Sequence, residues 1–540
     1  MSLSVLTLNI WGLWLVSKKR QERVKHLCHY LRTCTEDVVL LQEVWVDADA
    51  QALIRAGREA GLAHATHFRS GVFGSGLVTL SRHAISRHCF WRYAAGGFAT
   101  NISCGDYYAG KGVGWVRLAT PLGEVDVFNS HLHANYCHDY RQPDPALTRA
   151  AATAAGSLGE ERGDTAAVAA AAAALDAAGR GRLAVPAEAW LGSRLADDDD
   201  AGVRLSQLLE LTEIIRLASG DACNGNSQPS GDAGSGSSSS GAARLVVLGG
   251  DLNCKPDTLE LDLLRMRLPG MRDAWAAAAA AGGSGDGSSA ADGDGDGGSE
   301  LPANPEGFTC HAPGNSFQPR RQVPERIDYI WSNGTCASAQ LALQRVPGTS
   351  LSYSDHFAVR ATLTPPKPQP AVTSPSKGGP MRLLRSPSKQ RQQQQQDAAG
   401  NGSSGEGAAM PLQQRVATLM ASQLLLEEGM TCFGASSSML SMGGGILLAS
   451  VVYAAVALPL LLPDVVLRGW LLTVGLLAAG LVAGLGLLLL MMGQVADKTQ
   501  KRALQSSYRL LRVWMQEIGL DVPYSSRSSN STEPAPAAEQ

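Results

Sequence analysis

Two long stretches without a charged residue, near the end of the chain, limit what it can fold into. They are "GGGILLASVVYAAVALPLLL" (443–462) and "WLLTVGLLAAGLVAGLGLLLLMMG" (470–493). Each is long enough to cross the hydrocarbon core of a bilayer as one helix. Only the segment "PDVVLRG" separates them. The sequence therefore predicts a two-helix transmembrane hairpin. The alternative, a pair of buried helices in a soluble core, suits shorter or less uniformly apolar runs.

Basic residues flank this hairpin on both sides. Arg415 and the basic cluster between Arg382 and Arg391 precede it, and Lys498, Lys501 and Arg502 follow it. Positive charge beside a span favours the cytosolic side of a membrane. We therefore expect a two-span membrane protein whose large N-terminal part and tail (494–540) are cytosolic. The start "MSLSVLTLNIWGLW" is typical of a first strand and not of a signal peptide, so the endoplasmic reticulum or another endomembrane is the expected location.

Four tracts of biased composition interrupt or follow the N-terminal part. Three are rich in Ala, Gly, Ser or Asp (about 142–203, 220–243 and 276–306), and the fourth, 364–410, is rich in Pro, Gln, Ser and Gly. Such sequence buries too little apolar surface to offset chain entropy, so we interpret the first three as insertions and the fourth as a disordered linker. The alanine-rich tract could instead form a marginal helix. About 240 residues remain before position 364, enough for one large core.

Charge and cysteine content exclude several classes of protein. The chain has 46 basic and 49 acidic residues, a net charge of -3, which lacks the basic footprint of a nucleic-acid binder. Its ten cysteines include no CxxC pair, so neither a zinc site nor a disulfide framework is indicated. A reducing, cytosolic environment fits the N-terminal part.

Polar side chains follow or precede each apolar, strand-like run of the N-terminal part. The runs are separated by helical pieces such as "KRQERVKHLCHYLRT" and "RLSQLLELTEIIRLA", which favours an α/β fold. The polar residues are Asn9 in "LSVLTLNIWG", Glu43 in "EDVVLLQEVW", His131 and His133 in "EVDVFNSHLHANY", Asp251 and Asn253 in "ARLVVLGGDLN", Asp328 in "ERIDYIWSN", and Asp355 and His356 in "LSYSDHFAVRATL".

Each of these residues, taken singly, has an ordinary structural explanation. An Asn after a strand is usually a turn residue, and Glu43 could stand near the start of a helix. Together they supply carboxylates for a hard cation, amides and imidazoles for a phosphate, and an imidazole that can accept a proton. The joint pattern therefore predicts a hydrolytic site for a phosphate ester.

The order of the motifs resembles a known superfamily. "TLNIWG", "LLQEVW", "HLHA", "GGDLN", "RIDY" and "SDHFAV" are similar to the motifs of the endonuclease/exonuclease/phosphatase (DNase I-like) superfamily. "HFRSGVFGSGL", "GDYYAGKGVG" and the terminal hairpin further resemble the magnesium-dependent neutral sphingomyelinases within it. The resemblance implies a four-layer α/β sandwich, in which two mixed sheets are stacked face to face and helices pack outside, followed by the transmembrane hairpin.

The resemblance also implies roles for the residues. Glu43, with Asn9 beside it, would hold Mg²⁺, for which Mn²⁺ can substitute. His356 would be the general base and Asp251 would align the attacking water. Asn253 and His131 would donate to the phosphoryl oxygens.

Two roles remain open on the sequence alone. An aspartate orients the histidine in this superfamily, but Asp355 is its direct neighbour, and adjacent residues on a strand point to opposite faces. The orienting acid is therefore either Asp355 or Asp328. Lys111, with Asp106 as its partner, either binds substrate from a loop over the site or belongs to a surface turn.

A sphingomyelinase would release ceramide and phosphocholine from sphingomyelin at a bilayer surface. The alternatives are a lysophospholipase C acting on related choline lipids, a nuclease, and a membrane-tethered scaffold without activity. Neither the charge balance nor the hairpin favours a nucleic-acid partner. Since every motif precedes position 364, a chain cut near 410 is expected to be a soluble catalytic domain. The alternative is that the hairpin and tail complete the fold.

Overall fold

The strand-like runs of the sequence form two stacked sheets in the computed structural model. It describes residues 1–101, 105–135, 200–220, 244–281, 302, 304–319, 322–366, 412–461 and 465–517. Most of the expected insertions and of the expected 364–410 linker lie outside these residues. The exceptions are residues 200–203 and 276–281, which lie in or next to helices, and residues 220, 302, 304–306 and 364–366.

Each sheet has six strands, and their orders are β11-β12-β1-β2-β4-β3 and β5-β6-β7-β8-β10-β9. The first sheet contains β1 (Leu3–Asn9), β2 (Val38–Gln42), β3 (His64–His67), β4 (Val78–Ser81), β11 (Thr335–Ala342) and β12 (Ala358–Thr364). The second contains β5 (Ala84–Arg92), β6 (Gly112–Thr120), β7 (Gly123–His131), β8 (Leu245–Asp251), β9 (Arg272–Asp273) and β10 (Asp328–Ser332).

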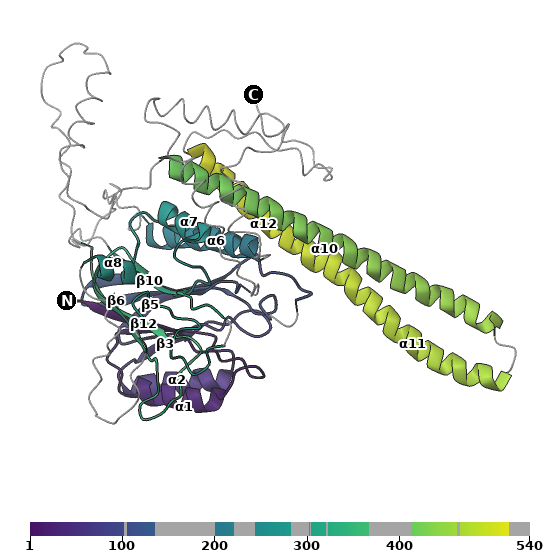
Figure 1. Ribbon diagram of the computed structural model, residues 1–540, viewed down its shortest axis with the longest axis horizontal. Coiled ribbons are helices and arrows are strands. Elements are labelled where there is room, and N and C mark those ends of the chain that lie inside the picture. Colours follow the sequence, from purple (N-terminus) through teal and green to yellow (C-terminus); the bar gives the residue numbers. More distant parts are fainter. Residues whose placement is uncertain are drawn as a thin grey trace, which may run out of the picture.

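Helices cover the outer face of each sheet. On the first sheet lie α1 (Arg20–Leu31) and α2 (Asp47–Glu59), and on the second lie α6 (Ala201–Ser219) and α7 (Leu259–Arg267), while α8 (Ala274–Ala280) packs on β10 and β11. The order helix, sheet, sheet, helix is visible from bottom to top in Figure 1. The predicted four-layer α/β sandwich is confirmed.

Apolar side chains fill all three interfaces between these layers. Val5 and Leu40 of the first sheet pack against Val127 and Val247 of the second. Leu27 and Leu53 join α1 and α2 to the outer face of the first sheet. This explains why β1, β2 and β8 are nearly continuous apolar runs, since strands buried on both faces lose the usual alternation of apolar and polar residues.

The strand register brings distant polar residues to one edge. β1 runs parallel to β2, with Asn9 opposite Gln42, so Glu43 follows at the same end. β7 runs parallel to β8, with His131 opposite Asp251. β10 is antiparallel to β8 and begins where β8 ends, so that Asp328 lies opposite Asp251.

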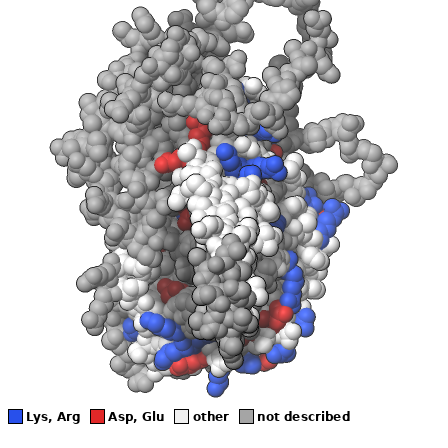
Figure 2. All heavy atoms as spheres, turned by 90° about the vertical axis from the view of Figure 1, so that its right-hand side faces the viewer, with Lys and Arg blue, Asp and Glu red and all other residues white. Residues whose placement is uncertain are grey.

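Beyond the sheets, the C-terminal segment forms helices that exceed the predicted spans. They are α10 (Leu412–Leu461), α11 (Val465–Met491), the π-helical turn η2 (Met492–Asp497) and α12 (Lys498–Glu517). α10 and α11 lie side by side and project away from the sandwich (Figure 1). Both pass the length and hydropathy test for a membrane span. Seen from the side to which they project, the described part of the hairpin that faces the viewer is white, while α10 carries its charged residues Arg415, Glu427 and Glu428 in its first half (Figure 2).

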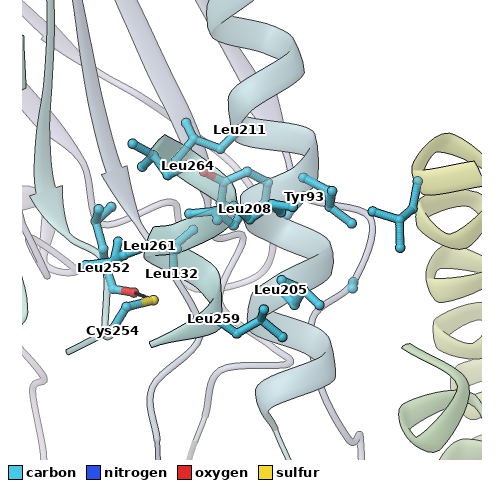
Figure 3. Close-up of a cluster of buried hydrophobic side chains, with 14 of the residues drawn as sticks. Tyr93, Leu132, Leu205, Leu208, Leu211, Leu252, Cys254, Leu259, Leu261 and Leu264 are labelled. Atoms are coloured by element: carbon cyan, nitrogen blue, oxygen red, sulfur yellow. Dashed lines mark hydrogen bonds between the residues drawn. The ribbon is translucent and has the colours of Figure 1, made fainter. Parts of the chain in front are cut away.

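The tail after the hairpin is part of the sandwich. α12 and the first half of α10 pack on α6, and α10 also contacts α7. Leu425 and Phe433 of α10 and Leu504 and Trp514 of α12 belong to the same buried cluster as the leucines of α6. Figure 3 shows several of those leucines, Leu205, Leu208 and Leu211, between the sheet and the terminal helices. In the structure α6 buries its outer face against the terminal helices, which favours the alternative that the hairpin and tail complete the fold. Whether a chain cut near residue 410 folds stays a prediction.

Candidate active site

The predicted site residues converge where the strands of both sheets meet. Asn9 and Glu43 come from the first sheet, and His131, Asp251 and Asn253 come from the second. His356 joins them because β12, antiparallel to β1, begins two residues later. Residues more than 300 positions apart in sequence thus share one cluster.

Asn9 connects the carboxylates of the two sheets. Its side-chain Nδ2 donates to Glu43 Oε1 at 2.9 Å and to Asp251 Oδ2 at 3.0 Å. Its Oδ1 accepts from the backbone N–H of Trp11 at 2.9 Å. Asn9 is therefore fixed in orientation, and it holds Glu43 and Asp251 on either side of one point.

His356 is oriented by Asp328. Asp328 Oδ2 lies 2.8 Å from His356 Nδ1, and Asp251 Oδ2 lies 4.0 Å from the same nitrogen. Asp355 instead accepts a hydrogen bond from its neighbour Ser354 Oγ at 3.1 Å. Of the two aspartates left open by the sequence, Asp328 is the one in contact, because its strand places it opposite Asp251 and beside the start of β12.

The buried charges of the site perturb one another. Burial opposes the imidazolium of His356, but Cys310 and Asp328 outweigh burial and raise its pKa well above the usual value. Burial and the neighbouring Asp328 raise the pKa of Asp251 to about 7. Burial, and then the charge of Asp355, raise the pKa of Glu43. Clustered perturbed groups of this kind are typical of catalytic sites.

Lys111 and Asp106 form a buried pair next to His131. Lys111 Nζ lies 2.9 Å from Asp106 Oδ1 and donates to the backbone oxygen of Leu132 at 2.8 Å. It also lies 3.2 Å from His131 Nε2. Burial raises the pKa of Asp106, but Lys111 and the histidines outweigh burial and hold it well below its usual range. The two side chains belong to the site and not to a surface turn.

These contacts determine the proton positions on His131. Burial and the positive charge of Lys111 both lower its pKa well below the usual value, so the imidazole is neutral at neutral pH. A lysine ammonium can only donate, so Nε2 accepts and the proton is on Nδ1. That atom is buried and has no hydrogen-bond partner among the described residues. It can donate to a ligand.

Two site residues adopt a left-handed backbone conformation. φ is 57° at Glu43 and 49° at Asn253, a region that is uncommon outside glycine. Asn253 is stabilised there because its backbone N–H donates to Asp251 Oδ1 at 3.0 Å. Its side-chain Nδ2 donates to the backbone oxygen of Leu132, also at 3.0 Å. Strained backbone at a strand end turns both side chains toward the cluster.

Two groups of ligand atoms could hold a cation. One consists of Asp251, Asp328 and His356, whose ligand atoms lie within 4.8 Å of one another. The other is the predicted pair of Glu43 and Asn9. Burial, and then the charge of Asp355, raise the pKa of Glu43, and a bound divalent cation would offset both effects. Oxygen ligands of this type suit Mg²⁺.

Some neighbours of the site were not identified from the sequence. Cys310 bridges to His356 through backbone pairing and is buried beside it. The backbone N–H of His133 donates to Gln207 Oε1 at 2.7 Å, and His133 Nδ1 lies 3.4 Å from Asp106 Oδ2. His133 therefore contacts Asp106, the partner of Lys111. No motif signalled Cys310 or Gln207, since both are placed by packing alone.

Comparisons with known proteins show which proteins the chain is similar to. A "Putative neutral sphingomyelinase" of Drosophila melanogaster is 40% identical over 25% of this chain and 30% of its own length. "Sphingomyelin phosphodiesterase 2" of Homo sapiens is 36% identical over 28% of this chain and 35% of its own length. "Inositol phosphosphingolipids phospholipase C" of Schizosaccharomyces pombe is 26% identical over 67% of this chain and 68% of its own length.

Among solved structures, sphingomyelinase C from Streptomyces griseocarneus covers 67% of this chain and 100% of its own, with 15% identity and a TM-score of 0.38. The family model for the Endonuclease/Exonuclease/phosphatase family matches residues 6–356. That range contains every residue of the catalytic cluster, from Asn9 to His356. The chain therefore belongs to the endonuclease/exonuclease/phosphatase family.

Proposed function

We propose that the protein is a Mg²⁺-dependent phosphodiesterase of the phospholipase C type, which hydrolyses sphingomyelin to ceramide and phosphocholine. The observation that carries the proposal is the pairing of His356 with Asp328 at 2.8 Å, in a cluster that also contains Asn9, Glu43 and Asp251. A proton acceptor, its orienting acid and the ligands for a cation then converge on one point. The named relatives support the choice of a sphingolipid.

The chain's own residues perform the proton and charge steps. In its neutral form His356 accepts a proton from water through Nε2, because Nδ1 is engaged by Asp328; its raised pKa means that the share of this form grows as the pH rises. Asp251 aligns that water from the other side. His131 Nδ1 and the second N–H of Asn253 donate to the phosphoryl oxygens, where negative charge grows in the transition state. Lys111 lies beside His131 and supplies a positive charge to the same oxygens.

Glu43 and Asn9 are the residues that would hold Mg²⁺, which when bound neutralises charge on the phosphoryl group and the leaving alkoxide. We favour this pair over the alternative group of Asp251, Asp328 and His356. In that group Asp328 Oδ2 is already bonded to the imidazole, whereas Glu43 Oε2 has only a long contact of 3.4 Å to Trp45 Nε1.

Exposed apolar side chains around the site support action at a lipid surface. In the loop after Asn9, Trp14 is 72% exposed and Leu15 is 85% exposed. In the loop between β3 and β4, Val72 is 80% exposed and Phe73 is 55% exposed. Both loops leave the first sheet at the edge where β1 and β2 end, and large apolar side chains exposed there indicate a membrane or protein contact. The hairpin of α10 and α11 would anchor the enzyme in the same membrane.

The packing of the helices that flank the hairpin supports a cytosolic location for the site. Both ends of the hairpin pack on the sandwich, since α10 and α12 contact α6. The catalytic cluster therefore lies on the side of the membrane that holds both flanks, and those flanks carry Lys498, Lys501 and Arg502. We infer that the enzyme acts on the cytosolic leaflet, at the endoplasmic reticulum or another endomembrane.

A substrate comparison tests the proposed function. Full-length protein is assayed for phosphocholine release from sphingomyelin in detergent micelles, with and without Mg²⁺. Lysophosphatidylcholine, an inositol phosphosphingolipid and an abasic DNA duplex are offered in parallel. Mg²⁺-dependent release from sphingomyelin is expected. Cleavage of DNA alone, or of no substrate at all, would overturn the proposal. Preference for the inositol lipid would keep the chemistry and replace the headgroup.

A further inference from the structure

A cavity of about 480 Å³ borders the candidate active site through Lys111. Its walls come from four places: the loop that contains Tyr107 and Tyr108, residues 92–96 at and after the end of β5, the β3–β4 loop at Gly71 and Val72, and the start of α12. Thr499 and Gln500 are the α12 residues in its lining. The segment that follows the transmembrane hairpin thus reaches the surroundings of the catalytic cluster.

The residues 93–98, here called the strap, connect α12 to the site. The backbone N–H of Gly96 donates to Gln500 Oε1 at 2.5 Å. Gln500 is only 5% exposed, so its amide is fixed and largely shielded from water. At the other end of the strap, the backbone N–H of Tyr93 donates to the backbone oxygen of Lys111 at 3.1 Å. A single short segment therefore links Gln500 to the site lysine.

The strap also contacts His133. Gly97 has φ of 90° and no side chain, and a Cβ added there would lie 2.3 Å from His133 Nε2. His133 in turn lies 3.4 Å from Asp106 Oδ2, the partner of Lys111. A shift of the strap would therefore reach the Asp106–Lys111 pair by two routes, one through Lys111 backbone and one through His133.

Tyr93 Oη also lies 2.6 Å from Ser130 Oγ of β7, and three further contacts of the strap are made with α6 and α10, which pack against α12. Ala94 N–H donates to Glu210 of α6, and the backbone oxygen of Ala95 accepts from Gln207 Nε2 at 2.8 Å. Phe98 stacks on Phe433 of α10, with ring centroids 4.1 Å apart. Because α12 packs on α6 and α10, these contacts form one unit. Within it, Gln500 is the polar α12 side chain that bonds the strap directly.

We propose that the cavity is a subsite for the phospholipid substrate and that Gln500 is a positioning residue which holds its wall. The inference rests on the proposed function, since it takes the ligand to be the lipid whose phosphate is cleaved beside Lys111. Gln500 does not touch the reacting atoms. It fixes Gly96, and Gly96 fixes the strap between the cavity and the Asp106–Lys111 pair. Substrate binding then depends on the chain after the hairpin.

Three full-length variants test this. Gln500→Ala removes the acceptor for Gly96 N–H, Gln500→Glu keeps an acceptor oxygen, and Gln516→Ala makes the same change at an exposed site on α12. We expect Gln500→Ala to raise the KM for micellar sphingomyelin about three- to tenfold, as for one lost hydrogen bond, with little change in kcat. Hydrogen exchange of the 93–98 peptide should become faster. Gln500→Glu and Gln516→Ala should resemble the unmodified protein in both measurements.

The outcomes separate this inference from the proposed function. If Gln500→Ala matches Gln516→Ala in KM and in strap exchange, the positioning role is wrong. An equal defect in Gln500→Glu and Gln500→Ala would also overturn it, because the acceptor would not be what matters. A lowered melting temperature with unchanged KM would show a merely structural role. If the unmodified protein hydrolyses no lipid, the proposed function fails, while strap exchange still reports on Gln500.

Discussion

At the scale of single residues, the site depends on side chains that orient one another. Asp328 holds His356 by Nδ1, and Asn9 holds Glu43 and Asp251. The Asp-His dipeptide of the sequence gives the impression that Asp355 is the partner of His356. The structure shows otherwise, because β8 and β10 are adjacent and antiparallel, and no property of residues 355 and 356 reveals that pairing.

Removal of the imidazole tests the proposed base. His356→Ala should lower kcat by a factor of about 10² to 10⁴, the usual effect of losing a general base, while circular dichroism and membrane attachment stay unchanged. His88→Ala, at an exposed position on β5, is the matched control and should be fully active. If a folded His356→Ala protein has a kcat within about twofold of the control, His356 is not the general base.

Substitution of the acidic ligand tests the cation site. Glu43→Gln nearly preserves volume but removes a charge, so the Mg²⁺ concentration for half-maximal activity should rise by roughly tenfold or more. The measurement is a Mg²⁺ titration of lipid hydrolysis after chelation. Glu59→Gln, on the exposed end of α2, is the control. An unchanged titration in Glu43→Gln would assign the cation to the group of Asp251, Asp328 and His356.

At the scale of secondary-structure elements, α6 connects the site to the terminal helices. Its leucines belong to one buried cluster with residues of the sheet and of α10 and α12. Gln207 and Glu210 of the same helix both bond the backbone of the strap. The helix α6 therefore both packs against the sheet and the terminal helices and holds the backbone of the strap.

The stability of this element should depend on pH. Burial raises the pKa of Glu210 to about 7 in the folded protein, well above the usual value that applies to the unfolded chain. Between these two values the folded state binds more protons, so stability is greatest below the lower value and declines as the pH rises through 7. Glu210→Gln cannot ionise and keeps an acceptor for Ala94 N–H. It should melt a few degrees higher than the unmodified protein at pH 8 and at a similar temperature at pH 4.5.

Thermal melts of both proteins across pH 4.5 to 8 check this expectation. The difference in melting temperature should grow with pH. A constant difference, or one that is largest at acidic pH, would show that Glu210 does not ionise with a raised pKa in the folded protein.

At the scale of the whole molecule, the hairpin is inserted between two helices that belong to the sandwich. The first half of α10 packs on α6 and α7, and α12 packs on α6. Arg267 Cζ of α7 also lies 3.4 Å from the ring centroid of Trp514 in α12. The apolar hairpin is therefore an insertion in the chain between two segments that pack on the catalytic sandwich. An anchor of this kind keeps the site close to its proposed substrate and raises the local concentration of lipid.

Two deletions distinguish this arrangement from a flexible tether. A chain that ends near residue 410 should aggregate or unfold, because it exposes the apolar face of α6 that α10 and α12 cover. A chain in which a short Gly/Ser linker replaces residues 442–491 keeps both supporting helices. It should be soluble and should hydrolyse detergent-dispersed sphingomyelin at the full-length rate, with much weaker activity on intact bilayers.

Specific activity on micelles and light scattering of both proteins are the measurements. A folded, fully active chain ending near 410 would show that the terminal helices are dispensable. Loss of micellar activity in the linker variant, despite a native melting curve, would show that the spans themselves support the site.

Composition and local pattern determined much of this protein. Uncharged runs of that length favour an apolar surrounding, so two candidate membrane spans are predicted from the sequence alone. Apolar runs ended by Asn9, Glu43 and Asp251 indicated buried strands with a site at their ends, because polar groups in such places require a partner. Those features are local, and local features are readable from one chain.

Tertiary structure alone decided which of these groups meet. Asp328 rather than Asp355 orients His356 because two strands from distant segments pair in one register. Likewise, the sequence predicts only that the segment of α12 belongs to a cytosolic tail. It does not specify which element α12 packs against. The structure shows that α6 needs this face to complete its buried surface, which brings Gln500 to the strap. Contacts between distant segments depend on register and packing, and these are properties of the folded chain and not of any stretch within it.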